Sequence, residues 1–174
     1  MPDPALSAAL AEAYASAPVD VVIMHTLEFR HSAFAEPIRV VSDHVPLTAT
    51  LEATAPLNPG EAVEFLAYAF GVQLPDVGSG RMPELLITID NIDQVIEENI
   101  EAASGSAENI EVTYRPYLST DLTAPHMDPP LTLTVTHIEA TVFQVRARAG
   151  FRNLGNLGFP NQDYTAERFP GLVR

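Results

Sequence analysis

The sequence contains no cysteine among its 174 residues. This absence excludes a disulfide framework, a thiolate zinc site, an iron–sulfur cluster and a cysteine nucleophile. Tryptophan is also missing, which argues against a glycosidase because sites for sugars commonly add aromatic platforms. The apolar runs are far shorter than the ~18 residues that suggest a membrane span, and the N-terminus lacks the basic region and apolar core of a signal peptide. We therefore expect a protein that is made in the cytoplasm and is not inserted in a membrane.

Lysine is absent too, so all nine basic residues are arginines, and 23 acidic residues give a net charge of −14. A surface of this sign does not neutralise phosphates, so we expect neither sequence-specific recognition of nucleic acid nor binding of duplex DNA at physiological salt. An acidic wall would, however, let DNA pass through a channel without adhering to it.

The spacing of apolar residues predicts two helices. Leu6, Leu10 and Tyr14 recur every fourth residue, which indicates a short helix over residues 4–15. A second helix is expected after Asp90, with Asp90 as its N-cap, Asp93 near its positive end and Gly105 after its last residue. Its apolar face would consist of Ile92, Val95, Ile96, Ile100 and Ala103.

Alternation of apolar and polar residues predicts strands in the rest of the chain. They are expected at 19–30, 36–43, 47–54, 63–74, 84–90, 110–117, 131–138 and 142–150, with 63–74 the longest. About eight short strands with few helices between them favour a mainly β (α+β) fold, an antiparallel β-barrel or sandwich with one or two packed helices. We assign residues 1–151 to this domain, including its N-terminal helix, and residues 152–174 to an extended C-terminal arm.

The candidate chemical residues give no convincing active site. His25 and Glu28 lie three apart on a predicted strand and face opposite sides. His126 and Asp128 could share a face, but without a third ligand they do not make a zinc site and fit a solvated loop. Asp90 and Asp93 resemble the start of a calcium loop, yet Val95 occupies the position of its glycine. We therefore predict no catalytic residues, no metal ligands, no cofactor and no enzymatic activity.

Several segments together resemble an uncharacterised family of small structural proteins encoded in the tail gene clusters of long-tailed phages (siphoviruses). They are PVDVVIMHTLEFRHSAF, EPIRVVSDH, IEVTYRPYLSTD, MDPPLTLTV, ARAGF and FPNQDYTAERFPGL. The resemblance covers most of the chain, with YRPYLS and FPGL as its more specific parts. It implies a virion protein of the tail tip, similar to distal tail proteins or to the first domain of tail hubs, whose β-barrels close into rings.

This resemblance also implies partners and a location. A subunit of that kind would form a homo-oligomeric ring, threefold if hub-like and sixfold if distal-tail-like, beside the tail-tube, hub and tape-measure proteins. DNA would pass through its channel. It would be assembled in the host cytoplasm and end in the phage tail tip. The alternatives are a tail-associated hydrolase, which the missing nucleophile and metal motifs disfavour, and a receptor-binding module.

The C-terminal arm carries the predicted interface. Its aromatic and apolar residues Phe159, Tyr164, Phe169 and Leu172 would be exposed if the arm were only a frayed end. Such residues are depleted in disordered segments. Pro160 and Pro170 preset extended backbone, which reduces the entropy lost when the arm docks. We therefore expect these four side chains to dock, either on the same subunit or on the next one around the ring.

Overall fold

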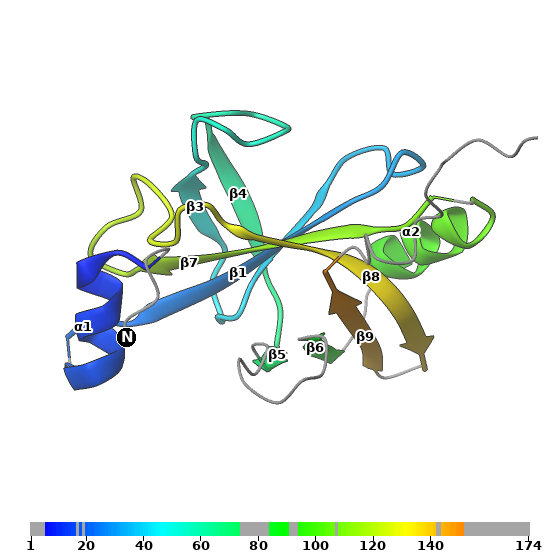
Figure 1. Ribbon diagram of the computed structural model, residues 1–174. Coiled ribbons are helices and arrows are strands. Elements are labelled where there is room, and N and C mark those ends of the chain that lie inside the picture. The colour runs from blue at the N-terminus through cyan, green and yellow to red at the C-terminus, as the bar shows by residue number, and fades with distance from the viewer. Residues whose placement is uncertain are drawn as a thin grey trace, which may run out of the picture.

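The computed structural model describes residues 6–16, 18, 20–73, 84–90, 94–106, 108–141 and 144–151. Two helices and nine strands lie in these ranges (Figure 1). In chain order they are α1 (Ala8–Ser16), β1 (Ile23–Arg30), β2 (Ile38–Val41), β3 (Leu47–Thr50), β4 (Ala62–Ala67), β5 (Phe70–Gln73), β6 (Glu84–Asp90), α2 (Gln94–Ser104), β7 (Glu111–Leu118), β8 (Leu131–Ala140) and β9 (Gln144–Gly150). None of the helices in the described ranges is long and apolar enough to cross a membrane.

The nine strands form one sheet in the order β3-β4-β2-β1-β7-β8-β9-β6-β5. Every neighbouring pair is antiparallel except β2 and β4, which are parallel, with Val40 opposite Leu66 and Val41 opposite Ala67. The central pair is β1 with β7, in which Leu27 lies opposite Tyr114. The sheet is thus mixed rather than purely antiparallel.

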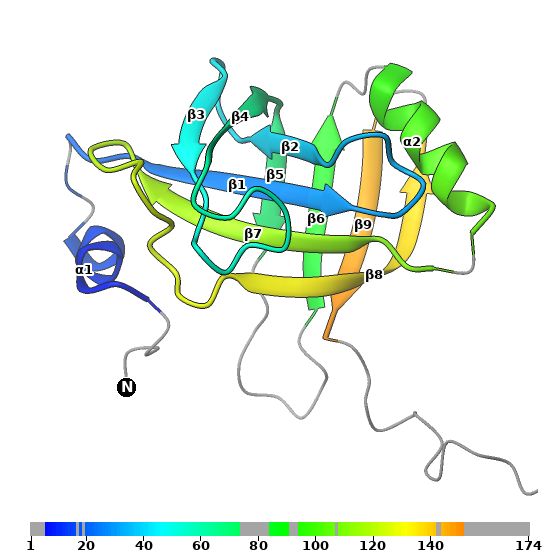
Figure 2. The same ribbon diagram turned by 90° about the horizontal axis from the view of Figure 1, so that it is seen from above.

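The sheet folds over on itself into two layers whose strands cross steeply (Figure 2). Strand β8 belongs to both layers, because residues 131–134 pair with β7 and residues 134–140 pair with β9. A register shift between Val135 and His137 marks the place where its pairing with β9 becomes irregular. Such irregularities bend a strand, which lets one strand turn the corner between two layers.

A second corner lies between β4 and β5, which are separated by Tyr68 and Ala69 alone. The Tyr68 amide donates to the Val41 carbonyl, and the Asp90 amide donates to the Ala69 carbonyl, each at 3.0 Å. This short segment therefore bonds to β2 in one layer and to β6 in the other. Because the end strands β3 and β5 do not pair, the sheet is a two-layered sandwich and does not close into a barrel.

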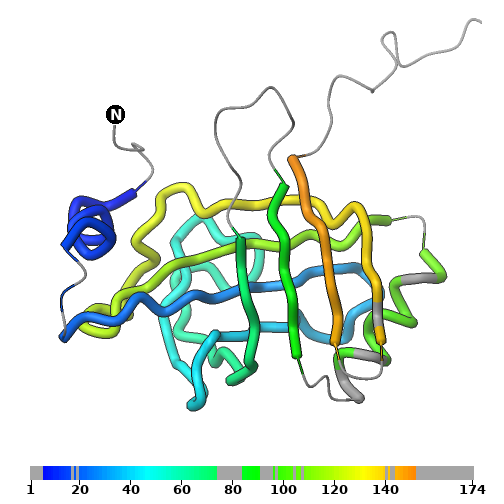
Figure 3. Tube along the Cα trace, turned by 90° about the horizontal axis from the view of Figure 1, so that it is seen from below, coloured from blue at the N-terminus to red at the C-terminus, as the bar shows by residue number. Residues whose placement is uncertain are grey.

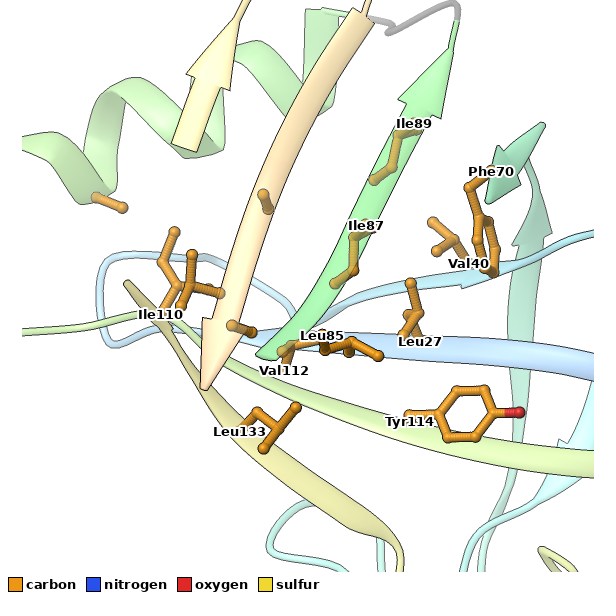
Figure 4. Packing of buried hydrophobic residues seen from close by; sticks show 14 residues of the cluster. Leu27, Val40, Phe70, Leu85, Ile87, Ile89, Ile110, Val112, Tyr114 and Leu133 are labelled. Carbon is orange, nitrogen blue, oxygen red and sulfur yellow. The ribbon is translucent and has the colours of Figure 1, made fainter. Parts of the chain in front are cut away.

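Figure 3 shows the strands of one layer crossing those of the other, and the main core fills the space between the two layers (Figure 4). Leu27 and Tyr114 project from one layer, and Leu85 and Ile87 project from the other, all with side chains 1% exposed or less. Helix α2 closes one end of the sandwich, where Ile96 and Ala103 are buried as predicted. Predicted face members Ile92 and Val95 lie outside the residues whose side chains are described.

A second cluster lies on the other side of β1 and β7, beneath the hairpin of β3 and β4. Phe65 of β4 packs there against Tyr117 of β7, with ring centroids 6.2 Å apart. Helix α1 adds a small third cluster, in which Leu10 contacts Leu118. The Ser7 hydroxyl caps α1 by accepting a hydrogen bond from the Leu10 amide at 3.2 Å.

The mainly β fold with two helices is confirmed, while several boundaries differ from the prediction. The expected long strand over 63–74 is two strands, because the chain turns between layers at Tyr68 and Ala69. The longest described strand is β8 instead. Asp90 is the last residue of β6 and helix α2 is described from Gln94, while the residues between them, on which the predicted N-cap depends, lie outside the described ranges. Helix α1 begins at Ala8, and Tyr14 on its predicted apolar stripe is 47% exposed.

Candidate functional site

A buried charge cluster is the most distinctive chemical feature of the described chain. It consists of Glu28, Arg30, Arg39, Glu52 and Arg115. The Glu28 and Arg115 side chains are completely buried. Glu28 and Arg30 lie two apart on β1, Arg39 lies opposite Glu28 on β2, and Arg115 comes from β7. Because side chains alternate across a strand, these positions place all four on the face of the layer that looks away from the main core.

Segment 51–61, which follows β3, covers this face and supplies Glu52. Arg115 donates to both Glu52 oxygens, from Nε at 2.7 Å and from Nη2 at 2.8 Å. Arg39 donates from Nε to Glu28 at 2.7 Å and from Nη2 to the Asn58 amide oxygen at 2.9 Å. Bidentate and charge-assisted bonds of this kind fix geometry, so the cluster fastens the covering segment to the sheet at two points.

One carboxylate oxygen of Glu28 faces two arginine nitrogens at longer distances. Glu28 Oε1 lies 3.4 Å from Arg115 Nη1 and 3.6 Å from Arg30 Nε. None of these three buried atoms has a hydrogen-bond partner within the described residues. Electrostatic attraction therefore joins Glu28 to each of the two arginines, and it is strong here because little water surrounds the charges.

Glu52 and Arg115 keep their charges near neutral pH. Burial alone would raise the pKa of Glu52, but the hydrogen bonds and positive charge of Arg115 outweigh it and lower that pKa. Burial alone would lower the pKa of Arg115, but Glu52 and Glu28 raise it. Neither group can give or take a proton near pH 7. This chemistry suits a fixed electrostatic brace rather than acid–base catalysis.

A histidine–tyrosine pair lies on the opposite face of β1. His25 Nδ1 is 2.7 Å from the Tyr114 hydroxyl, and the two rings are stacked with centroids 5.9 Å apart. Burial lowers the pKa of His25. Burial, and then the neighbouring Tyr14 hydroxyl, raise the pKa of Tyr114. Both groups are therefore neutral at pH 7, and the pair is a hydrogen bond at the edge of the core.

The His25 shift predicts that the folded protein becomes less stable as the pH falls. Since the folded-state pKa is lowered, the unfolded chain binds the proton more readily, and acid therefore favours unfolding. Between about pH 8 and pH 5, where histidines titrate, the free energy of unfolding should decline more steeply in the wild type than in His25→Gln. Urea unfolding at several pH values measures both slopes, and equal slopes would contradict the prediction.

The candidate metal residues do not assemble into a site. His126 Nδ1 is 3.0 Å from the Ser7 hydroxyl, and its Nε2 is 3.8 Å from an Asp121 carboxylate oxygen. Among the described residues no group of three or more His, Asp and Glu side chains could hold a metal ion, and Asp128 brings no further ligand to His126. Asp90 instead accepts a hydrogen bond from Gln144 Nε2 at 2.6 Å, while Asp93 lies outside the described ranges.

The other predicted positions have mixed outcomes. The strand predicted over 131–138 continues to Ala140, so His137 lies inside β8, and its Nε2 is 3.1 Å from a Glu139 oxygen. The predicted interface residues Phe159, Tyr164, Phe169 and Leu172 lie outside the described residues, as does the whole arm after Phe151.

Sequence reasoning missed the charge cluster, although one signal was present. Glu28, Arg39 and Arg115 each interrupt an apolar strand at a position that faces protein rather than solvent. A charge in the middle of such a strand requires a buried partner. The sequence does not say which partner, because the pairing depends on strand register.

The fold and the cluster together define a two-layered, mainly β protein whose buried charges serve its architecture. The chain belongs to the family described as "Domain of unknown function (DUF1833)", whose sequence profile matches residues 9–164. No curated protein matches the sequence.

Proposed function

We propose that the protein is a structural subunit of a phage tail tip, which forms or lines a ring at the distal end of the tail. Its partners would be further copies of itself and the neighbouring tail-tube, hub and tape-measure proteins. The proposal draws first on the resemblance of the segments in β1, β2, β7 and β8 to proteins of phage tail gene clusters. The proposal includes both a distal-tail-like and a hub-like position.

The observation that carries this proposal is the open sheet. Strands β3 and β5 are its two ends, and in the described part of the chain each pairs with a single strand. The outer edge of such a strand offers main-chain N–H and C=O groups to another chain. A ring requires two different contact surfaces on each subunit, and two unlike sheet edges satisfy that requirement.

The acidic composition agrees with a channel that DNA crosses. Three of the five arginines in the described residues belong to the charge cluster and form ion pairs with Glu28, Glu52 or the nearby Glu111. Most of the carboxylates therefore have no basic counterpart, since the chain carries 23 acidic residues. A surface dominated by negative charge repels a phosphate backbone and prevents adhesion.

The mass of the purified full chain in solution tests the proposal. Light scattering should report three or six copies, and electron microscopy should show closed rings that also label at the tail tips of virions. A protein that stays monomeric at high concentration and is absent from virions would overturn it. A monomer that binds envelope polymers would favour a receptor-binding module, and one that cleaves them would favour a hydrolase.

Cutting the chain after Phe151 should leave a folded domain that no longer forms rings. The described sheet ends at Gly150, so its strand pairing survives the cut. The docking residues Phe159, Tyr164, Phe169 and Leu172 are lost, each contributing about 1.5–3 kcal/mol if buried. Circular dichroism checks the fold, and light scattering checks the assembly.

The double variant Tyr164→Ala with Phe169→Ala should reproduce much of this loss without shortening the chain. Normal assembly of the truncated protein would refute docking of the arm between subunits. Loss of folding would instead show that the arm belongs to the core of its own subunit.

A further inference from the structure

A groove runs over the outer face of the layer formed by β5, β6, β8 and β9, the face that looks away from the core. It has a volume of about 420 Å³ and is lined by residues of all four strands. Two rows cross it, because Thr88 lies opposite Gly71 and Arg146, while Leu86 lies opposite Gln73 and Arg148. We call this surface the arginine groove.

Gly71 keeps the groove open. A Cβ atom added at this position would meet no heavy atom within 4 Å, and the backbone there suits any L-residue. A larger side chain would therefore project into the groove without displacing neighbours. This position offers a way to fill the groove while leaving the strand intact.

Arg148 is a charged group in the groove that has no ion-pair partner among the residues that the structure describes. Arg146 donates from Nε to the Gln144 amide oxygen at 2.7 Å. The nearby carboxylate of Glu139 lies 3.1 Å from His137 Nε2. Within the described residues Arg148 makes no ion pair, although the chain carries a net charge of −14. Beside it Leu86 is 39% exposed, so a cation stands next to an apolar surface.

Strand β4 presents the complementary pair. Val63 and Phe65 face the second cluster, so Glu64 and Leu66 lie together on the other face. Leu66 is 46% exposed, and Glu64 makes no ion pair within the described ranges. We call Glu64 and Leu66 the β4 strip. The strip therefore places a negative charge next to an apolar side chain, whereas the groove places a positive charge next to one.

The two surfaces lie in different layers of the sandwich, the groove on the outer face of the layer with β5, β6, β8 and β9 and the strip on β4 beside β2. Strand β4 is next to one end of the sheet order, and β6 is next to the other. Figure 1 shows β4 on one side of the β1–β7 pair and β5, β6 and β9 on the opposite side. One subunit therefore cannot bring its own strip into its own groove, but a neighbour can.

We propose that the β4 strip of one copy docks into the arginine groove of the next, with Glu64 on Arg148 and Leu66 on Leu86. Glu64 and Leu66 are two residues apart on one strand, a spacing of about 6.6–6.8 Å. Leu86 and Arg148 lie opposite each other on paired strands, a spacing of about 4.5–5.5 Å. The long arginine side chain can make up the difference between the two spacings. The contact is heterologous, so repetition closes into a ring or continues as a filament. This inference rests on the proposed ring-forming function and names one of its interfaces.

Charge complementarity favours another copy as the occupant. Copies that each carry −14 repel one another at long range, so a contact between them needs a local site where opposite charges meet. In the described part of the chain, Arg146 and Arg148 are the arginines outside the charge cluster. The arginine groove is therefore the place where an acidic strip of a second copy is attracted rather than repelled.

A charge reversal in the full-length chain tests this contact. Arg148→Glu and Glu64→Arg should each weaken self-association by more than tenfold, because each places like charges together at the interface. The double variant Arg148→Glu with Glu64→Arg should restore the assembly. Gly71→Leu should weaken it as well by filling the groove. Sedimentation or light scattering over a range of concentrations measures all of these.

Two controls complete the experiment. Glu12→Arg makes the same change in net charge as Glu64→Arg at an exposed residue of helix α1, outside both surfaces, and it should leave the assembly unchanged. Circular dichroism should report wild-type folding for every variant, since the altered side chains are exposed. A wild-type assembly that tolerates Arg148→Glu, or that the double variant fails to restore, would overturn the contact while the ring-forming function stands. A monomeric wild type would overturn both.

Discussion

Replacing Arg115 with methionine should lower the free energy of unfolding by about 3–5 kcal/mol, the usual cost of removing one partner from a buried ion pair. The Arg115 side chain is fully buried and bonds both oxygens of Glu52. Its loss leaves Glu28, also fully buried, with weaker compensation from Arg30 and Arg39. The loss is a large share of the ~5–15 kcal/mol that stabilises a typical domain.

The companion variants decide whether the charge or the volume of Arg115 matters. Arg115→Lys keeps the positive charge but not the bidentate hydrogen bond to Glu52, so it should lower the free energy of unfolding by less than Arg115→Met does. Adding Glu52→Gln to Arg115→Met should lower the free energy of unfolding by less than Glu52→Gln does in the wild type, because Glu52 has already lost its Arg115 partner. Urea unfolding measures each value. A loss below about 1 kcal/mol for Arg115→Met, within the range of ordinary mutations, would show that the cluster does not brace the fold.

Acid should weaken the same brace by a separate route. The pKa of Glu52 is lowered in the folded protein, so its stabilising effect is complete above its ordinary pKa. The effect is lost as the pH falls through the lowered value. This loss begins at a lower pH than the one expected from His25, so the two are separable in a pH series.

Replacing Phe65 with alanine should also cost about 3–5 kcal/mol, the usual cost of truncating a buried aromatic side chain. Phe65 is completely buried in the second cluster and packs against the ring of Tyr117. A cavity would remain between the β3–β4 hairpin and the β1–β7 pair. Denaturant unfolding gives the cost, and Val45→Ala, at a side chain 64% exposed, should stay within about 0.5 kcal/mol of the wild type.

Hydrogen exchange can show where the Phe65→Ala protein opens. The second cluster lies outside the space between the layers, so amides of β3 and β4 should lose protection before those of β6 and β9. Uniform loss across all strands would indicate that the two clusters unfold as a single unit. An unchanged stability would contradict the assigned packing.

Local periodicity was sufficient to predict most elements. In β8, Leu133 and Val135 alternate with Thr132 and Thr134, and the two apolar residues are buried as that pattern requires. In α2, the spacing of Ile96 and Ala103 correctly predicted the buried face. These predictions succeeded because side-chain direction along a strand or helix depends on the backbone repeat alone.

The break between β4 and β5 could not be predicted in this way. Apolar alternation continues from Leu66 to Val72, so the pattern looks like one strand. The chain divides because Tyr68 bonds to β2 while Ala69 bonds to β6. Whether a sheet folds over at such a point depends on strands that are distant in the sequence.

By itself, the sequence determined the class of fold, the acidic balance, the exclusion of cysteine chemistry and the inward faces of β8 and α2. All of these follow from composition or from repeats of a few residues. The tertiary structure alone decided that Glu28, Glu52 and Arg115 meet, that β4 and β5 separate, and that Arg148 and Glu64 lie in different layers without an ion pair among the described residues. Those outcomes depend on register and on the bending of the sheet, and both are set by contacts between residues far apart in the chain.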